Sequence, residues 1–389
     1  MTSPVVPIPD WADVESQTIP LRRIWQMLSL FESVEYGMRM ITSQAQRAGA
    51  VAFRAREESG RELAACVKQA RGYFEAAETA SIAVSPLLLF YGVSSLAKAV
   101  VVARSPEYGL FNMRPYHGLS ASRIAHKNVG KKGLSREVMA FEATVGPTGT
   151  FVEYAETLSG AVVYRVNDVT AKRPTTLKIS TLAASSLPGM RILLGDLLAR
   201  QPAIRSIYHH ATGNRPLNHY GVTTVDFSTG ATQLLASFAD DPPDKDLEAH
   251  VRAHFPQLAT GQCATSARGS VEGMNGESRS FSTTQPVPMF PLSSDLGMRS
   301  STSPVAGYFV APFGPGVLSE ALQLYALSYL LGMLVRYHPT SWMELIAGGQ
   351  GDQAFALCRS AAEMLRERFP VLALEGLTSY AHERTFTTL

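Results

Sequence analysis

The strongest chemical signal in the chain is a basic segment without acidic residues. No aspartate or glutamate occurs between Glu107 and Glu137. The stretch from 114 to 136 carries eight basic or imidazole side chains: Arg114, His117, Arg123, His126, Lys127, Lys131, Lys132 and Arg136. Cations without neighbouring carboxylates attract phosphates, and the glycines of this stretch allow backbone N–H groups to approach an anion closely. The segment therefore predicts a site for a phosphate-bearing ligand, a nucleotide or RNA. The alternative is a solvated basic loop.

A second cluster of polar and aromatic residues runs from Arg336 to Trp342, with the sequence RYHPTSW. Proline disfavours helical backbone at the residue before it, so a helix is expected to end near His338 and another to begin after Thr340 or Ser341. In the functional interpretation, Arg336 and His338 face a pocket beside this corner and contribute to ligand binding. In the alternative, the segment is an interhelical corner with Trp342 in the core.

Catalytic and metal-binding patterns are weaker. Arg205 and His210 have the R-x4-H spacing of some helical ribonucleases, in which arginine holds phosphate and histidine activates the 2′-hydroxyl. A pattern with only two fixed positions matches many sequences by chance, so the catalytic residues stay unassigned. His250 and His254 share one helical face and could chelate zinc, but no third ligand lies at a diagnostic spacing. We expect no metal and no cofactor.

Charge and cysteine content narrow the class of protein. The 389 residues have a formal net charge of +2, which excludes a polycation that coats nucleic acid along its whole length. The three cysteines, Cys66, Cys263 and Cys358, are far apart and form no CxxC motif. Neither a disulfide framework nor a cysteine zinc site is expected, and a reducing cytoplasm fits best.

Common enzyme and membrane motifs are missing from the sequence. It contains no P-loop, GxGxxG, HExxH or GxSxG motif, which disfavours several enzyme classes. The most apolar stretch, 87–103, includes Lys98 and is shorter than the ~20 apolar residues of a membrane span. It is therefore expected to form a buried core helix, and no membrane partner is expected.

The spacing of apolar residues indicates which elements position these groups. Spacings of three and four predict helices, whereas alternation of β-branched or aromatic with polar residues predicts strands. Helices are predicted at 19–47, 49–80, 86–104, 181–208, 318–336 and 342–369. Strands are predicted at 138–156, 161–169, 220–238 and 306–310.

These elements predict a mainly α protein with an inserted α+β region. Its expected parts are an extended arm over 1–18, a discontinuous helical domain over 19–137 and 316–389, a mixed α/β insertion over 138–258, and an irregular Gly/Ser/Thr-rich connection over 259–315. The helices are expected to pack together, with 138–235 as a separate β-containing lobe. The stretch 260–284 is expected to be a loop because its composition buries little apolar area.

Several blocks in order carry a family resemblance. They are SPLLLFYGVSSLAKAVVVA from Ser85, HGLS from His117, LLGDLLARQPAIRSIY from Leu193, YLLGMLVRYHPTSW from Tyr329, and ERFP from Glu367. Their order and spacing, over about 20–375, resemble the YaaC-like family of bacterial proteins. That family has no agreed biochemical activity, so the resemblance implies more about the fold than about the function.

The segment YGVSSLAKAVV also resembles the central helix of HEPN-type helical bundles, which include RNA-cleaving toxins, defence effectors and inert scaffolds. This resemblance implies a bundle built from both chain ends. The catalytic bundles need arginine and histidine at short spacing after this helix. Here Arg104 is followed by Ser-Pro, and the next histidine is His117.

Three hypotheses for the function follow from the sequence. The first is a non-catalytic nucleotide- or nucleic-acid-binding accessory protein in a larger bacterial assembly, with antiviral defence as one setting. The second is a metal-independent ribonuclease of the HEPN type. The third is a structural subunit that forms homo-oligomers or binds a partner protein. The sequence identifies neither the ligand nor the partner.

Overall fold

The computed structural model describes residues 21–47, 49–105, 109–124, 133–158, 161–168, 173–180, 183–226, 231–237, 247–255, 262–266, 278–283, 306–313, 318–348, 352–378 and 383–387. The predicted arm over 1–18 lies outside these residues, as does 125–132 of the basic segment.

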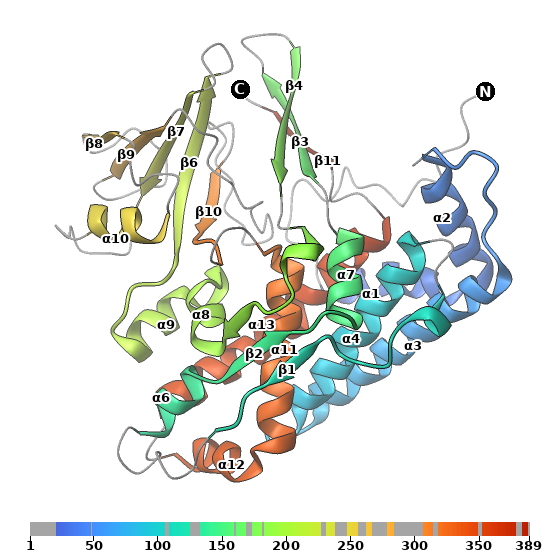
Figure 1. Ribbon diagram of the computed structural model, residues 1–389, viewed down its shortest axis with the longest axis horizontal. Helices are drawn as coiled ribbons and strands as arrows, with labels where there is room; N and C mark the ends of the chain where they lie inside the picture. The colour runs from blue at the N-terminus through green and yellow to red at the C-terminus, as the bar shows by residue number, and fades with distance from the viewer. Residues whose placement is uncertain are drawn as a thin grey trace.

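The protein is mainly helical, as the sequence predicts, and its helical body draws on both ends of the chain (Figure 1). Four long helices pack together: α3 (Glu57–Thr79), α4 (Ser85–Arg104), α11 (Glu320–Tyr337) and α13 (Asp352–Thr378). Shorter helices extend this body: α1 (Leu21–Leu28), α2 (Val34–Arg47) and α12 (Pro339–Ala347). The 3-10 turn at Ser29–Glu32 interrupts the helix predicted over 19–47.

Helix α4 lies at the centre of the helical body. It contacts α3, α11 and α13, and most of its residues are buried. Pro86 occupies its first turn, where an absent N–H costs no hydrogen bond, as predicted. By length and composition α4 could cross a membrane, but 78% of its apolar window is buried inside the protein. Its apolar surface on all sides is therefore explained by helix packing.

Part of the predicted insertion packs into the helical body. Strands β1 (Leu119–Ala121), β2 (Glu142–Val145) and β5 (Arg191–Leu193) form an antiparallel sheet in the order β1-β2-β5. Helices α6 (Leu134–Met139), α7 (Thr150–Leu158), α8 (Leu194–Ala199) and α9 (Arg205–Thr212) accompany this sheet. Buried residues of 138–158 and 184–208 share one core with α4 and α11. The boundary expected at residue 138 therefore does not coincide with a packing boundary.

The strand predicted through FVEYAETL is wrong, since this segment forms α7. Phe151, Val152, Tyr154 and Ala155 are buried and recur at one-, three- and four-residue spacings, which gives the helix a single apolar face. Aromatic and β-branched residues suggested a strand, but their burial against the helical body determines the structure.

The remaining strands form two sheets on one side of the helical body (Figure 1). One has the order β10-β6-β7-β9-β8, from β10 (Ala306–Val310), β6 (Asn218–Asp226), β7 (Ala231–Ser237), β9 (Ser278–Thr283) and β8 (Gln262–Ser266). The other has the order β11-β3-β4, from β11 (Glu383–Thr387), β3 (Ala161–Asp168) and β4 (Arg173–Ser180). Helix α10 (Leu247–His254) lies between β7 and β8 in the sequence.

The loop expected over 260–284 and the irregular connection expected over 259–315 need correction. They contain β8 and β9, which were not predicted, whereas β10 is the strand predicted at 306–310. Strand β9 pairs antiparallel with both β7 and β8, with Phe281 opposite Leu234 on one side and Cys263 on the other. A sheet ladder uses backbone N–H and C=O groups, so small polar residues can form a strand beside an open strand edge.

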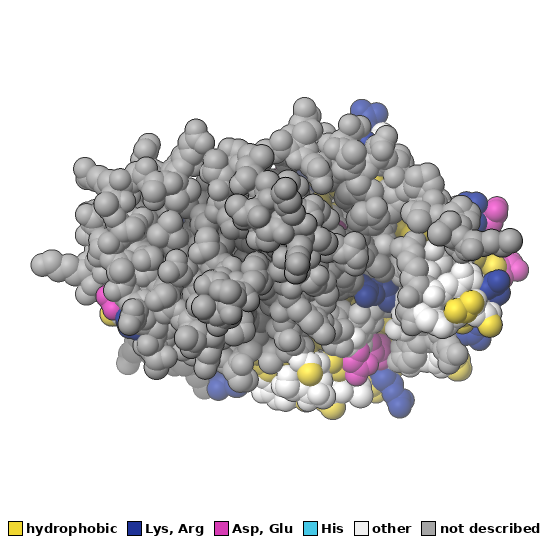
Figure 2. Space-filling view, turned by 90° about the horizontal axis from the view of Figure 1, so that it is seen from above, with side chains coloured by type: hydrophobic (Ala, Val, Ile, Leu, Met, Phe, Trp, Pro, Cys, Tyr) yellow, Lys and Arg dark blue, Asp and Glu magenta, His cyan; other side chains and the backbone are white. Residues whose placement is uncertain are grey.

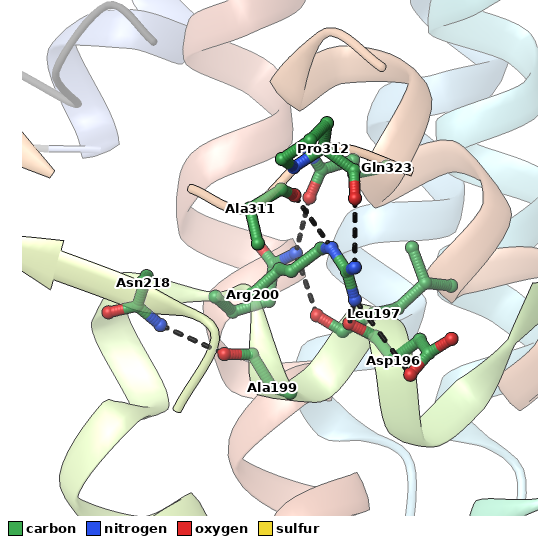
Figure 3. A network of polar contacts seen from close by, with 9 residues as sticks. Asp196, Leu197, Ala199, Arg200, Asn218, Ala311, Pro312 and Gln323 are labelled. Carbon is green, nitrogen blue, oxygen red and sulfur yellow. Dashed lines mark hydrogen bonds and ion pairs between the residues drawn. The ribbon is translucent and has the colours of Figure 1, made fainter. Parts of the chain in front are cut away.

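A buried polar network connects the five-stranded sheet to the helical body (Figure 3). The Arg200 guanidinium donates to the backbone oxygens of Ala311 at 2.8 Å, Pro312 at 3.0 Å and Asp196 at 2.9 Å. It lies 4.1 Å from the centre of the Phe313 ring. Nearby, Asn218 Nδ2 donates to the oxygen of Ala199. The network fixes the paired ends of β6 and β10, where Asn218 lies opposite Val310.

Candidate functional site

The loop over 109–124 carries His117 and is anchored by side chains of three helices. Glu62 of α3 accepts the N–H of Leu110 at 3.0 Å, and Glu153 of α7 accepts the N–H of Arg114 at 3.3 Å. The Tyr329 hydroxyl of α11 donates to the oxygen of Leu119 at 2.9 Å. These contacts tie the loop to distant parts of the chain, so the position of His117 depends on the tertiary fold.

Two glycines allow this loop to reach the beginning of α7. Gly118 and Gly149 have φ angles of +78° and +117°, in the region that favours glycine. A Cβ on Gly149 would lie 2.5 Å from the backbone nitrogen of Gly118. The close approach permits the N–H of Phe151 to donate to the oxygen of His117 at 3.0 Å. The backbone on both sides of His117 is therefore fixed.

The His117 ring is half-buried between aromatic side chains. It makes an edge contact with Phe90 of α4 at 5.0 Å and lies 6.0 Å from the Tyr329 ring, measured between centroids. Burial lowers the pKa of His117 below its ordinary value, and the charges of Lys98 and Arg336 lower it further. The imidazole is therefore predominantly neutral at pH 7, and two cations lie close enough to affect it.

Lys98 and Arg336 come from different helices, α4 and α11. The Arg336 guanidinium donates to the Tyr91 hydroxyl at 3.4 Å and lies 5.0 Å from the centre of the Tyr337 ring. Neither cation forms an ion pair with any carboxylate in the described part of the chain. We define the His117 site as Lys98, His117, Arg336, Tyr91 and Tyr329.

The composition of the His117 site suits an anion. The charges of two cations act on the half-buried imidazole, and no acidic side chain contributes to the shift in its pKa. A phosphate here would be attracted by both charges and could accept or donate a hydrogen bond at the imidazole, depending on its protonation. The buried thiols do not add a nucleophile, because burial raises the pKa values of Cys66 and Cys358 to about 12.

The structure brings together only part of the predicted ligand-binding set. His117 and Arg336 share one site, whereas the Arg114 and Arg123 side chains are exposed. His126, Lys127, Lys131 and Lys132 lie outside the described residues. The ring of His338 packs 5.3 Å from that of Phe141. On the face seen from above, some described basic side chains stand beside acidic ones and others stand apart from them (Figure 2).

Arg205 and His210, the catalytic candidates, both belong to α9. At about 100° of rotation per residue, their five-residue separation places them roughly 140° apart around the helix axis. His210 is exposed, whereas the charge of Arg205 contributes to lowering the pKa of buried His219. The helix therefore directs these two side chains differently, and Arg205 lies nearer to His219.

The predicted histidine pair of α10 does lie together, with 4.6 Å between the ring centroids of His250 and His254. The ring of His219 lies 5.4 Å from that of His250. Among the residues that the structure describes, no group of three histidine, cysteine or acidic side chains is arranged to hold a metal ion. The cluster thus packs α10 against the start of β6.

Comparison with protein families adds an identification to this geometry. The model of the family described as YaaC-like protein matches residues 29–377, which include every residue of the His117 site. The chain belongs to the YaaC-like family. No curated protein and no solved structure matches this YaaC-like chain.

Sequence reasoning missed three members of the His117 site in this YaaC-like chain: Lys98, Tyr91 and Tyr329. Lys98 did carry a signal, because it is the sole charged residue between Pro86 and Arg104 in an otherwise apolar helix. A lysine kept within a core helix must reach solvent or a partner. The two tyrosines resemble ordinary core residues in the sequence.

Proposed function

We propose that the protein binds a nucleotide or nucleic acid by holding a phosphate at the His117 site. The observation that carries this proposal is the contact path from Arg336 through Tyr91 and Phe90 to the half-buried His117, in a site where neither Arg336 nor Lys98 has an ion pair from described carboxylates. The charges of both cations lower the pKa of His117. Phosphate contacts supply most of the affinity of proteins for nucleic acids, and unpaired cations at a fixed position favour them.

The site supports binding because its parts are fixed before a ligand arrives. The His117 backbone is hydrogen-bonded to α7, and Tyr329 anchors the following residues of the loop. Arg336 is oriented by the Tyr91 hydroxyl. Preorganised groups lose little conformational entropy on binding, so a small site can still bind a phosphate measurably.

We further propose that this binding serves a larger bacterial assembly in the cytoplasm, with antiviral defence as one setting. The resemblance of α4 to the central helix of HEPN-type bundles is the support for this role. A structural role without a ligand is the competing hypothesis, and the binding experiment below separates the two.

A ribonuclease is a second candidate because His117 has its pKa lowered. A neutral imidazole can accept the proton of a 2′-hydroxyl, and adjacent cations can stabilise charge that develops on the phosphate. Incubation with RNA in the presence of a chelator tests this candidate. Fragments with 2′,3′-cyclic phosphate ends that disappear with His117→Gln would support cleavage, whereas intact RNA would favour binding alone.

Fluorescence anisotropy with a labelled single-stranded RNA, at several salt concentrations, tests the main proposal. Lys98→Met and Arg336→Gln should each weaken binding and make the logarithm of affinity less dependent on the logarithm of salt, by roughly 0.7 for each lost phosphate contact. Arg54→Gln is the matched control, since Arg54 is exposed and, among the described residues, donates only to backbone oxygens nearby. Equal losses in all three variants, or no binding by the parent, would contradict the proposal.

A further inference from the structure

Exposed aromatic residues follow Arg336 and precede His117 in the chain. Tyr337, which lies beside Arg336, keeps 60% of its side chain exposed, and Tyr116, the residue before His117, keeps 64%. Tyr91 is partly buried and packs 5.5 Å from the Tyr73 ring, measured between centroids. An exposed aromatic ring beside a cation presents both a face for stacking and a positive charge to a ligand.

The positions of these rings relate them to the phosphate site. Arg336 connects them, because its guanidinium lies over the Tyr337 ring and donates to the Tyr91 hydroxyl. The Tyr91 ring packs 5.6 Å from that of Phe90, and the Phe90 ring lies 5.0 Å from that of His117, measured between centroids. Because Arg336 contacts both Tyr337 and Tyr91, the exposed Tyr337 ring and the half-buried imidazole belong to one continuous group of side chains.

We infer that the ligand of the His117 site is an unpaired strand of nucleic acid, one of whose bases stacks on Tyr337 while its phosphate lies at Arg336. This inference rests on the proposed function and specifies its ligand. Interleaved cations and aromatic faces are the arrangement by which proteins hold single strands, because every base has a π-face and every linkage carries a charge.

Other phosphate ligands fit this surface less well. An inorganic polyphosphate would use the cations and leave the exposed rings without a partner. A duplex has its bases stacked on one another, so they are not available to Tyr337 without an unstacking cost. An unpaired base attached to a phosphate uses both features.

The test compares two labelled probes of equal length by fluorescence anisotropy: a single-stranded oligonucleotide and the same sugar–phosphate chain without bases. Comparison of RNA and DNA versions of the intact strand shows which of these two nucleic acids supplies the unpaired base. Stacking of one base corresponds to a change in affinity of roughly fivefold to a hundredfold, so the intact strand should bind more tightly by about that factor. Tyr337→Leu should remove the difference, and Tyr337→Phe should retain it.

Phe111→Leu is the matched control, because Phe111 is 93% exposed and makes no ring contact with the His117 site. It should bind both probes as the parent does. Equal affinity of the parent for the two probes, or a Tyr337→Leu variant that still prefers the intact strand, would overturn the stacking inference and leave phosphate binding in place. Failure of the parent to bind either probe would instead overturn the proposed function, together with this inference.

Discussion

Substitution of Gly149 tests how the fold fixes the loop that carries His117. In Gly149→Ala the new Cβ would lie 2.5 Å from the nitrogen of Gly118, 2.7 Å from the oxygen of Tyr116 and 2.8 Å from the Cα of Gly118. All three atoms are backbone, so no side chain can rotate to relieve the overlap. The loop and the beginning of α7 must move apart.

Two effects should lower the free energy of unfolding of Gly149→Ala. Alanine at a φ of +117° is strained by about 1–2 kcal/mol. Separation of the two segments also endangers three hydrogen bonds, in which the N–H groups of Thr150, Phe151 and Gly146 donate to the oxygens of Tyr116, His117 and Gly118. Each is worth about 0.5–1.5 kcal/mol net. The free energy of unfolding should therefore fall by about 3–6 kcal/mol in total.

Gly189→Ala is the control, because Gly189 has a φ of +82° and no atom within 4 Å of the position of a Cβ. It should show the backbone strain alone, about 1–2 kcal/mol. Urea unfolding followed by circular dichroism measures both variants. If their free energies of unfolding agree within about 0.5 kcal/mol, the close approach of Gly118 and Gly149 does not constrain the loop, and the reasoning is refuted.

Three further predictions concern other parts of the molecule. Arg200→Met should lower the free energy of unfolding by about 2–4 kcal/mol, because it leaves the oxygens of Ala311 and Pro312 without their donors; an unchanged urea midpoint would contradict this. Arg368→Met should lower the free energy of unfolding by about 3–5 kcal/mol because it leaves the Glu320 carboxylate unpaired. Adding Glu320→Gln should restore part of that stability, and no recovery in the double variant would show that the pair is not coupled. Burial and neighbouring charges hold the pKa of His219 well below 6.5, so this residue takes up its proton in the unfolded chain before it does so in the folded protein. The free energy of unfolding should therefore fall as the pH drops below about 6.5, by at most about 1.4 kcal/mol per pH unit for this group. Urea unfolding at graded pH should show a shallower fall for His219→Gln than for the parent.

The helical body could be predicted from the sequence because its helices carry strong local signals. In α4, proline in the first turn and a long apolar run indicated both the beginning of the helix and its burial. The errors fell where tertiary contacts override local preference. Helix α7 is rich in residues that favour strands, and β9 is rich in residues that favour loops, yet packing and strand pairing determine both.

Of the candidate site, only His117 and Arg336 were predictable from the sequence. Both belong to short segments where basic residues or prolines stand out in the sequence. The association of Lys98 with His117 depends on how the loop folds back onto α4, and Tyr91 depends on the same packing. Contacts between residues distant in sequence have no local pattern, so single-sequence reasoning could not assemble this site.

The titration of His117 by NMR tests the central claim most directly. His117→Gln identifies the ring signal among the nine histidines. Without a ligand, the pKa should lie below 6.5, because burial and the charges of Lys98 and Arg336 disfavour the imidazolium. When single-stranded RNA is bound, a phosphate beside the ring should raise that pKa. An unchanged titration of His117 under conditions in which anisotropy shows the RNA to be bound would contradict the account.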